Sequence, residues 1–260
     1  MSSVSIANVS KVFPGHGGSD EAVLALDGVT FDVADREFCS ILGHSGCGKT
    51  TLLMMLAGFE QPTAGTIRVD GKPVGSPTWQ RTVVFQDYAL FPWMTVEQNI
   101  AFGLEMKNVP AEARRDLVAR NVAVVGLKGF ERRYPHQLSG GMKQRVSIAR
   151  ALAVDPEVLL MDEPFAALDA QNRSRMQEEM GRILAGADEA IRKTMVLVTH
   201  SIEESILLSD HIVVLTRRPG RVKAELRVDL PRPRSEDDPR FIALKRRIRD
   251  LIHDEFEIET

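Results

Sequence analysis

A glycine-rich stretch near the start of the chain constrains the fold more than any other feature of the sequence. It reads Gly43-His44-Ser45-Gly46-Cys47-Gly48-Lys49-Thr50 and is followed by Thr51. The apolar residues 38–42 predict a buried strand before it, and residues 49–56 predict a helix after it. The glycines let backbone N–H groups approach phosphate oxygens, and the helix N-terminus adds free amides and a partial positive charge. The stretch therefore predicts a nucleotide-binding loop, with Lys49 on the β- and γ-phosphates and Thr50 on Mg²⁺.

The composition is that of a soluble globular protein. The chain has 260 residues, of which 43% are hydrophobic and 27% charged, enough for one large domain or two small ones. A net charge of -3 argues against a general nucleic-acid binder. Cys39 and Cys47 lie in or beside the glycine-rich stretch, which favours a reduced setting without a structural disulfide. We expect no signal peptide, and no window approaches the ~20 apolar residues that span a bilayer.

Alternating and paired segments predict an antiparallel β layer in the first third of the chain. Residues 4–13 alternate apolar and polar side chains, as a half-buried strand does. Asp27-Gly28 and Asp70-Gly71 each lie between two short strand-like segments, which predicts two hairpins with two-residue turns. We expect this layer to wrap around the strand that precedes the glycine-rich stretch.

Short apolar segments further along predict two central parallel strands, residues 158–161 and 195–198, and residues 82–85 and 212–215 predict two more strands. From residue 96 to about residue 154 the strand signals give way to helical periodicity, which predicts a helical subdomain inserted into the nucleotide-binding core. Later, Met176, Met180 and Ile183 predict one face of a helix, and residues 201–204 predict a capping box.

Four polar residues at predicted strand ends are candidates for the chemistry of phosphoryl transfer. Asp162 ends an apolar strand and is expected to hold Mg²⁺, while Glu163 is expected to orient or deprotonate the attacking water. His200, after the next strand, is either a contact to the γ-phosphate or a structural histidine. Gln86, after a third strand, is a candidate contact to both Mg²⁺ and the water.

A second glycine pair opens another predicted helix, in the stretch Leu138-Ser139-Gly140-Gly141-Met142-Lys143-Gln144-Arg145. A helix N-terminus without side-chain bulk suits a phosphate, and a glycine cap without a ligand has the same sequence pattern. The glycine-rich stretch already provides a phosphate site for one nucleotide. A second phosphate site in the same chain is explained if it binds the nucleotide of another chain. We therefore expect two copies to face each other head to tail, with Ser139, Gly140 and Gly141 of one copy on the γ-phosphate bound by Lys49 of the other.

The end of the chain, residues 231–260, differs in character. Prolines lie at the ends of a polar linker, and the helix that follows is amphipathic. Its apolar side carries Phe241, Leu244, Ile248 and Leu251, and its other side is basic. A solvated face on a docked terminal helix is favoured over binding to a membrane surface.

Together, these motifs resemble the ATP-binding subunit of an ABC transporter. The resemblance covers residues 1–225 and includes, in the family's order, the glycine-rich stretch, Gln86, LSGGMKQR, LLMDEP, Ala167-Leu168-Asp169 and His200. It implies an α/β fold: a P-loop NTPase (RecA-like) core with an antiparallel β subdomain and a helical subdomain of about residues 87–155, all within residues 1–230. It also implies hydrolysis of ATP to ADP and phosphate between two subunits. Phe13 would stack on adenine, although an aromatic residue at the end of a strand often serves only to pack the core. At position 166 the family often has a serine, and Ala166 lacks its hydroxyl.

Residues 91–96, 200–204 and 218–221 resemble the branch that imports nitrate, sulfonates, taurine or related small anions, and neighbouring branches import other solutes with similar ATPases. This resemblance implies three kinds of partner: an identical or paired ATPase subunit, an integral membrane permease and, indirectly, a solute-binding protein, with no nucleic acid. It implies a peripheral location at the cytoplasmic face of the cell (inner) membrane. The aromatic residues 88–93 either pack the helical subdomain or receive a helix of the permease.

Two other function classes fit parts of the sequence. An ABC-type ATPase that acts on chromosomes would carry long coiled coils between Lys49 and Ser139, and one that acts on ribosomes would carry two cassettes in one chain. This chain has one cassette and no sustained heptads. A phosphate-loop kinase would leave residues 139–141 and Glu163 unexplained. A transport ATPase without a pore of its own is therefore the preferred interpretation.

Overall fold

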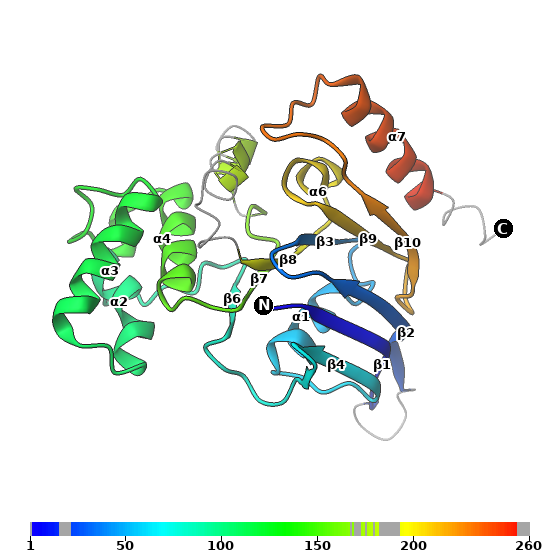
Figure 1. The fold of residues 1–260 in the computed structure, drawn as a ribbon, viewed down its shortest axis with the longest axis horizontal. Helices are drawn as coiled ribbons and strands as arrows, with labels where there is room; N and C mark the ends of the chain where they lie inside the picture. The colour runs from blue at the N-terminus through cyan, green and yellow to red at the C-terminus, as the bar shows by residue number, and fades with distance from the viewer. Residues whose placement is uncertain are drawn as a thin grey trace.

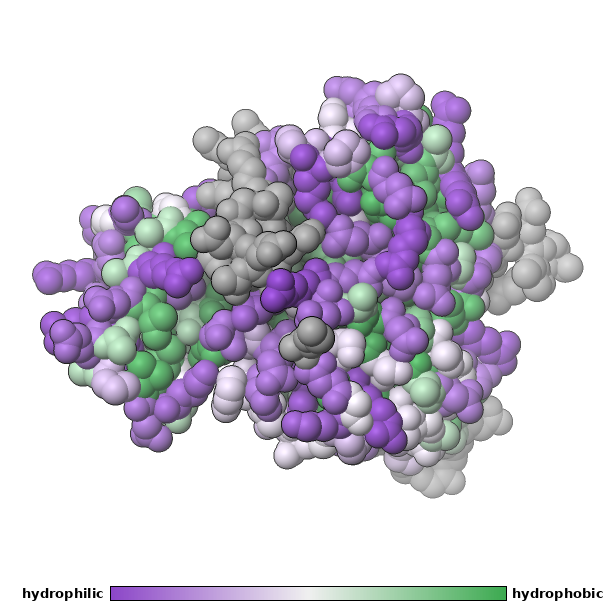
Figure 2. All heavy atoms as spheres, in the orientation of Figure 1, coloured by the Kyte–Doolittle hydropathy of each residue, from purple (hydrophilic) through white to green (hydrophobic). Residues whose placement is uncertain are grey.

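A computed structural model describes residues 2–15, 22–166, 168, 173–174, 176–178, 180–181 and 193–253 of the chain. Within these ranges the chain forms a six-stranded sheet, a four-stranded sheet and a helical lobe to one side (Figure 1). One face of the molecule is largely hydrophilic, with hydrophobic areas over the helical lobe and near the terminal helix (Figure 2).

A mostly parallel sheet of six strands forms the centre of the fold. In spatial order its strands are β10 (Val222–Arg227), β9 (His211–Leu215), β3 (Phe38–Leu42), β8 (Thr194–Thr199), β7 (Val158–Asp162) and β6 (Arg81–Val84). All neighbours pair in parallel except β10, which runs antiparallel to β9. β3, β8 and β9 are buried along their whole length, as apolar strands in the middle of a covered sheet are. The predicted parallel strands are confirmed.

The predicted antiparallel layer is present as a second sheet. In spatial order its strands are β2 (Val23–Val33), β1 (Val4–Phe13), β4 (Ala64–Val69) and β5 (Lys72–Pro73). Asp70 and Gly71 form the predicted two-residue turn, because Val69 pairs with Lys72 and both turn residues have positive φ, 49° and 73°. Positive φ at both positions is what a type I′ hairpin turn needs.

The hairpin predicted at Asp27-Gly28 is wrong. The residues on both sides of this dipeptide belong to one strand, β2, which pairs with β1 from Val23 to Val33. Gly28 has a φ of 61°, and Asn8 on the partner strand has a φ of 51°, where the register between the strands shifts. The glycine therefore accommodates a bulge within a continuous pair of strands and does not reverse the chain.

One helix, α1 (Lys49–Ala57), fills the space between the two sheets. Its residues Leu52, Leu53 and Leu56 are at most 1% exposed and share a core with residues of both sheets, including Ile6. Residues 52–57 of this helix are all apolar, and a helical segment that is apolar on all sides must be buried in this way. The packing also holds the loop before α1 against both sheets.

The helical lobe contains α2 (Val96–Met106), α3 (Ala111–Val124) and α4 (Gly140–Ala153). Thr95 begins α2 with a complete capping box: its Oγ1 accepts from Gln98 N at 3.3 Å, and Gln98 Oε1 accepts from Thr95 N at 2.8 Å. Ile100, Leu104 and Val146 belong to a hydrophobic cluster formed by the lobe itself. The predicted helical insertion therefore has its own core, separate from those around the sheets.

Helices on the side of the six-stranded sheet away from α1 include α6 (Ile202–Leu208) and α7 (Pro239–His253) (Figure 1). The predicted amphipathic terminal helix is confirmed, since Phe241 and Ile248 of α7 are fully buried in a cluster with residues of α6 and β9. In the helices that the structure describes, no segment is both long and apolar enough to cross a membrane.

Between Glu163 and β8 the structure describes only part of the chain. Met176 and Met180 are helical and buried, as predicted. Ile183, Ala167 and Asp169, which the sequence also singles out, lie outside the described residues.

Ser201 caps α6 as predicted, but the capping box is incomplete. Ser201 Oγ accepts from Glu204 N at 3.2 Å. In a complete box the Glu204 side chain would return to Ser201 N. That amide instead donates to Thr199 Oγ1 at 3.0 Å, and the Glu204 carboxylate accepts from Thr199 and Gln177.

Candidate functional site

The glycine-rich loop between β3 and α1 holds its lysine in a fixed position. Gly48 has a φ of 99°, which residues with a Cβ rarely adopt, and a methyl group there would lie 2.6 Å from Leu26 Cδ2. The Lys49 residue is 5% exposed, and its Nζ donates to Gly43 O and His44 O, both at 2.9 Å. The ammonium group is therefore bound within the loop by the loop's own carbonyls.

Thr50 and Asp162 meet beside this loop. Thr50 Oγ1 donates to Asp162 Oδ1 at 3.0 Å, which joins the start of α1 to the end of β7. Burial raises the pKa of the Asp162 carboxyl above its ordinary value of 3.8, against the opposing effect of this hydrogen bond. The arrangement brings a hydroxyl and a carboxylate oxygen together next to the phosphate loop.

Glu163 and His200 are in contact at neighbouring strand ends. His200 Nδ1 lies 3.0 Å from Glu163 Oε2. An ionised carboxylate has no proton to donate, so Nδ1 carries the proton in this hydrogen bond. Glu163 has a φ of 43°, which is uncommon for a non-glycine residue, and its N–H donates to Val198 O at 3.0 Å. Pairing with β8 thus holds Glu163 in an unusual conformation, with its carboxylate against the imidazole.

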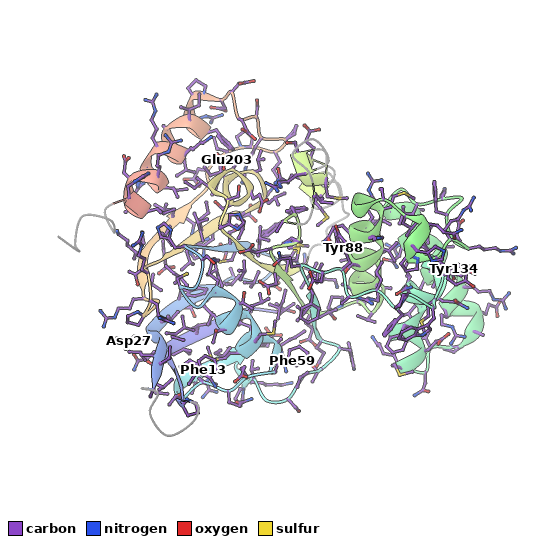
Figure 3. All side chains as sticks on the ribbon, turned by 180° about the vertical axis from the view of Figure 1, so that it is seen from behind. Phe13, Asp27, Phe59, Tyr88, Tyr134 and Glu203 are labelled. Carbon is purple, nitrogen blue, oxygen red and sulfur yellow. The ribbon has the colours of Figure 1, made fainter. Side chains whose placement is uncertain are left out.

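A pocket of about 280 Å³ collects most of the predicted nucleotide contacts. Its lining comes from both sheets and the loop: Phe13, Val23, Ala25, Ser45, Gly46, Gly48, Lys49, Thr50, Thr51, Glu163 and Arg218. Phe13 lies at the end of β1 (Figure 3), with Lys11 Nζ 4.9 Å from the centroid of its ring. The structure therefore brings Phe13, the glycine-rich loop and Glu163 to one pocket.

Gln86 lies at the same edge of the sheet but does not line this pocket. It is exposed and follows β6, in which Val84 pairs with Met161 of β7. Gln86 and Glu163 each lie two residues beyond this pair, so they lie beside each other in the parallel register. The sheet topology thus groups these side chains as predicted, one strand apart.

Ser139, Gly140 and Gly141 lie at the start of α4 on the helical lobe. Ser139 Oγ accepts from Met142 N at 3.3 Å and caps the helix. A methyl group at Gly140 would lie 3.2 Å from Tyr88 Oη, so the phenol hydroxyl lies close to this helix start (Figure 3). None of the three residues lines the pocket among the residues the structure describes. Their predicted contact to phosphate therefore needs a second chain.

Arg218 lines the pocket, a role that its sequence motif, typical of the importer branch, does not indicate. It follows β9, beside the strand that leads into the glycine-rich loop. The turn is fastened there by Gly220, whose N–H donates to Ala25 O at 2.9 Å and whose carbonyl accepts from Asp27 N at 3.0 Å. Finding Arg218 from sequence would require the order of the strands, because only that order puts β9 next to β3.

A comparison with protein families decides what kind of protein this is. A family model described as ABC transporter matches residues 26–166. The chain belongs to the ABC transporter family. This ABC protein is the ATP-binding part of a transporter and acts as an ATPase.

Relatives match the ABC ATPase over nearly its whole length. It is 48% identical over 250 residues to the uncharacterised ABC transporter ATP-binding protein MJ0412 of Methanocaldococcus jannaschii, covering 96% of this chain and 91% of that protein. It is 44% identical over 241 residues to the nitrate import ATP-binding protein NrtD of Synechocystis, covering 93% and 88%. It is 45% identical over 252 residues to the bicarbonate transport ATP-binding protein CmpC of Synechococcus elongatus, covering 94% of this chain but only 37% of CmpC.

The fold also matches that of a solved ATP-binding cassette. The dimeric cassette MJ0796, in a post-hydrolysis state bound to ADP and phosphate, has a TM-score of 0.73 and 29% sequence identity. The match covers 88% of this chain and 100% of that chain. The predicted fold class, a P-loop NTPase core, is confirmed.

Proposed function

We propose that this ABC ATPase is the motor subunit of an importer and that two subunits, arranged head to tail, hydrolyse ATP between them. The observation that carries the proposal is the hydrogen bond between Glu163 and His200 at the pocket that contains Lys49. A carboxylate at such a place can act on water, and a lysine in a phosphate loop can bind the group that the water attacks. The partner subunit is identical or a paired ATPase, and residues 1–230 form the domain that works in this way.

In this mechanism the loop residues bind and neutralise phosphate. Lys49 and the backbone amides around it attract the triphosphate, and the N-terminus of α1 adds its partial charge. Ser139, Gly140 and Gly141 of the facing copy contribute a second set of amides to the γ-phosphate. These contacts exist only in the closed dimer, so ATP favours closure by the free energy of that second set. Loss of the γ-phosphate removes the preference and lets the dimer open.

Glu163 and His200 act on the attacking water. The Glu163 carboxylate orients the water and accepts its proton as the oxygen attacks phosphorus. His200 donates a hydrogen bond to the carboxylate and holds it in place, next to the γ-phosphate. Gln86 contacts the same water from the end of β6, and Phe13 contacts the base at the other end of the pocket.

Mg²⁺ fits the donor set at this edge of the sheet. It prefers hard oxygen ligands, and usually takes one or two carboxylates together with substrate phosphates. Thr50 Oγ1 and Asp162 Oδ1, 3.0 Å apart, are such oxygens and would hold it with the Gln86 side chain. When bound, the ion would neutralise phosphate charge as it develops.

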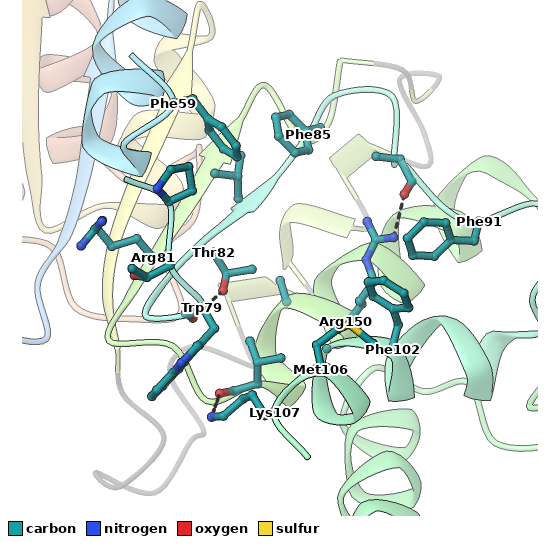
Figure 4. A pocket seen from close by; sticks show the side chains of 17 residues that line it. Phe59, Trp79, Arg81, Thr82, Phe85, Phe91, Phe102, Met106, Lys107 and Arg150 are labelled. Carbon is teal, nitrogen blue, oxygen red and sulfur yellow. Dashed lines mark hydrogen bonds between the residues drawn. The ribbon is translucent and has the colours of Figure 1, made fainter. Parts of the chain in front are cut away.

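A cleft of about 630 Å³ between β6 and the helical lobe is the proposed site for the permease (Figure 4). Its lining includes Phe59, Trp79, Phe85, Phe91, Phe102 and Met106, and we call it the aromatic cleft. Arg150 of α4 donates to Ala89 O at 2.6 Å and to Tyr88 O at 3.1 Å, which fixes the segment after Gln86 at the wall of the cleft. An apolar helix of the permease in this cleft would connect the transport path with the residue that contacts the attacking water.

The transported solute is proposed to be a small anion such as nitrate, a sulfonate or taurine, supplied to the permease by a solute-binding protein. Similarity to NrtD, a nitrate import protein, supports this class of solute. The subunit would then work peripherally, at the cytoplasmic face of the inner membrane. Residues 231–260 form an appended linker and helix outside the ATPase domain.

The Glu163→Gln variant tests the proposed chemistry. The amide cannot accept the proton, so we expect turnover to fall by about a hundredfold or more while ATP binding is retained. With Mg²⁺ and ATP the variant should accumulate as a dimer, measured by light scattering after size exclusion. A Lys49→Ala/Glu163→Gln control should bind nucleotide weakly and stay monomeric. Near-normal turnover of Glu163→Gln would assign the base elsewhere, and a strictly monomeric ATP-bound form would refute the head-to-tail site.

A further inference from the structure

A buried carboxylate lies behind the strand end that carries His200. Glu204 of α6 is 5% exposed, and its two carboxylate oxygens accept from different elements. Thr199 Oγ1 donates to Oε2 at 2.6 Å, and Gln177 Nε2 donates to Oε1 at 2.9 Å. Each oxygen of the carboxylate is therefore committed to one donor, and the donors come from segments far apart in sequence.

One of these contacts fixes the backbone around His200. Thr199 precedes the histidine, and its Oγ1 also accepts from Ser201 N at 3.0 Å. Ser201 Oγ in turn accepts from Glu204 N at 3.2 Å. The residues on both sides of His200 are thus bonded to Glu204 or to one another, and the imidazole projects from between them toward Glu163.

The other contact leads to the segment that follows Glu163. Gln177 is 6% exposed and belongs to the partly described helical residues after that segment. Four residues earlier, Arg173 donates from Nε to Phe165 O at 3.3 Å and from Nη2 to Leu168 O at 3.0 Å. Arg173, four residues before Gln177, therefore binds the backbone two and five residues after Glu163.

Burial of this carboxylate has an energetic cost that packing alone would not justify. Burial raises the pKa of Glu204 above its ordinary value of 4.5, against the opposing effects of the Thr199 hydrogen bond and of the Arg173 and His200 charges. Apolar residues of similar size often stabilise a core as well or better than a buried ion does. What a carboxylate adds is two directed acceptors, which fix the relative position of the groups that donate to them.

We propose that Glu204 is a positioning residue for ATP hydrolysis, which sets the distance between His200 and Glu163 by joining the end of β8 to the segment after β7. The inference rests on the proposed roles of Glu163 and His200 in hydrolysis. Glu204 does not touch the pocket, so it acts on the rate only through these two side chains. A misplacement on the scale of 1 Å at reacting groups costs up to about a hundredfold in rate.

Exchanging the two partners tests this role. In Glu204→Met a side chain of similar length carries no carboxylate oxygens, so the hydrogen bonds from Thr199 and from Gln177 are both lost. We expect kcat to fall by about ten- to a hundredfold, with KM for ATP changed less than about threefold. In the double variant Glu204→Gln/Gln177→Glu, the amide at position 204 can accept from Thr199 and donate to the carboxylate at position 177, which restores both bonds. Turnover of the double variant should return to within about threefold of wild type.

Glu203→Met is the matched control. It makes the same chemical change one residue earlier on α6, where the Glu203 side chain binds Lys245 Nζ of α7 at 2.6 Å (Figure 3). Its turnover should equal that of wild type, which separates the Glu204 effect from a general loosening of α6. Thermal unfolding of each full-length variant monitors folding.

Wild-type kcat in Glu204→Met would overturn the inference. So would a parallel loss of ATP affinity, or a folded double variant that is more than tenfold slower than wild type. If Glu204→Met does not fold, the turnover of the double variant is compared with wild type by the same tenfold limit. Glu163→Gln keeps the two proposals apart. An inactive Glu163→Gln together with a normal Glu204→Met refutes only the positioning role, whereas an active Glu163→Gln refutes the proposed chemistry.

Discussion

At the scale of single residues, Gly220 shows how closely the turn after β9 approaches the phosphate loop. A methyl group there would overlap the carbonyl oxygen of Cys47 and lie 2.9 Å from Leu26 Cδ2. Overpacking of this kind costs about 1–3 kcal/mol. We expect Gly220→Ala to lower the free energy of unfolding by that amount and to weaken ATP binding, because the displaced atom belongs to the loop. Urea unfolding and nucleotide titration measure the two effects.

Gly75→Ala is the control for this substitution. No atom lies within 4 Å of a methyl group at Gly75, so the free energy of unfolding should change by less than about 0.5 kcal/mol. If both alanine variants bound ATP like wild type, the contact between the turn and the loop would have no part in shaping the pocket.

Sequence reasoning can locate a functional residue when a local motif indicates its chemistry. Lys49 and Glu163 belong to such motifs, and each motif follows a strand that its apolar sequence predicts. Arg218 and Glu204 do not, since their roles depend on which strands are neighbours and on where Gln177 lies in space. For Glu204 the local pattern even pointed to a different partner, Ser201 N, which binds Thr199 instead.

At the scale of elements, two identical Asp-Gly dipeptides show why the ends of strands are harder to predict than the strands themselves. Asp70-Gly71 turns the chain, while Asp27-Gly28 lies inside a continuous strand. Both glycines have positive φ, but of the two aspartates only Asp70 does. The difference comes from β1, which is long enough to pair with β2 on both sides of Gly28. Such a partner is contributed by another part of the chain, so no window around the dipeptide reveals it.

Docking of α7 gives a prediction at the same scale. Phe241 is fully buried against the sheet and α6, whereas its neighbour Ile242 is 40% exposed. Phe241→Ala should lower the free energy of unfolding by about 3–5 kcal/mol, and Ile242→Ala by less than about 1 kcal/mol. Calorimetry of both variants compares them directly. Equal shifts in Tm would show that the helix does not dock through this face.

At the scale of the whole molecule, Trp93 tests the assignment of the aromatic cleft. Trp93 is 70% exposed, and the centroid of its ring lies 5.7 Å from that of Phe91, which lines the cleft. A charge on this surface would oppose an apolar partner helix, so Trp93→Glu should abolish uptake by the assembled transporter while the isolated subunit still binds ATP. Uptake into vesicles and nucleotide titration are the measurements.

Phe130→Glu is the matched control, because Phe130 is an exposed aromatic residue of the helical lobe, 40% exposed, that does not line the aromatic cleft. This variant should transport normally. Normal uptake by Trp93→Glu would remove the cleft from the transport mechanism.

The nucleotide pocket and the aromatic cleft share none of their lining residues. If the aromatic cleft binds the permease as proposed, substitutions in its lining can accumulate during evolution without altering the residues that bind ATP. Related ATPases could then diverge to serve permeases for different solutes while keeping the same hydrolytic site.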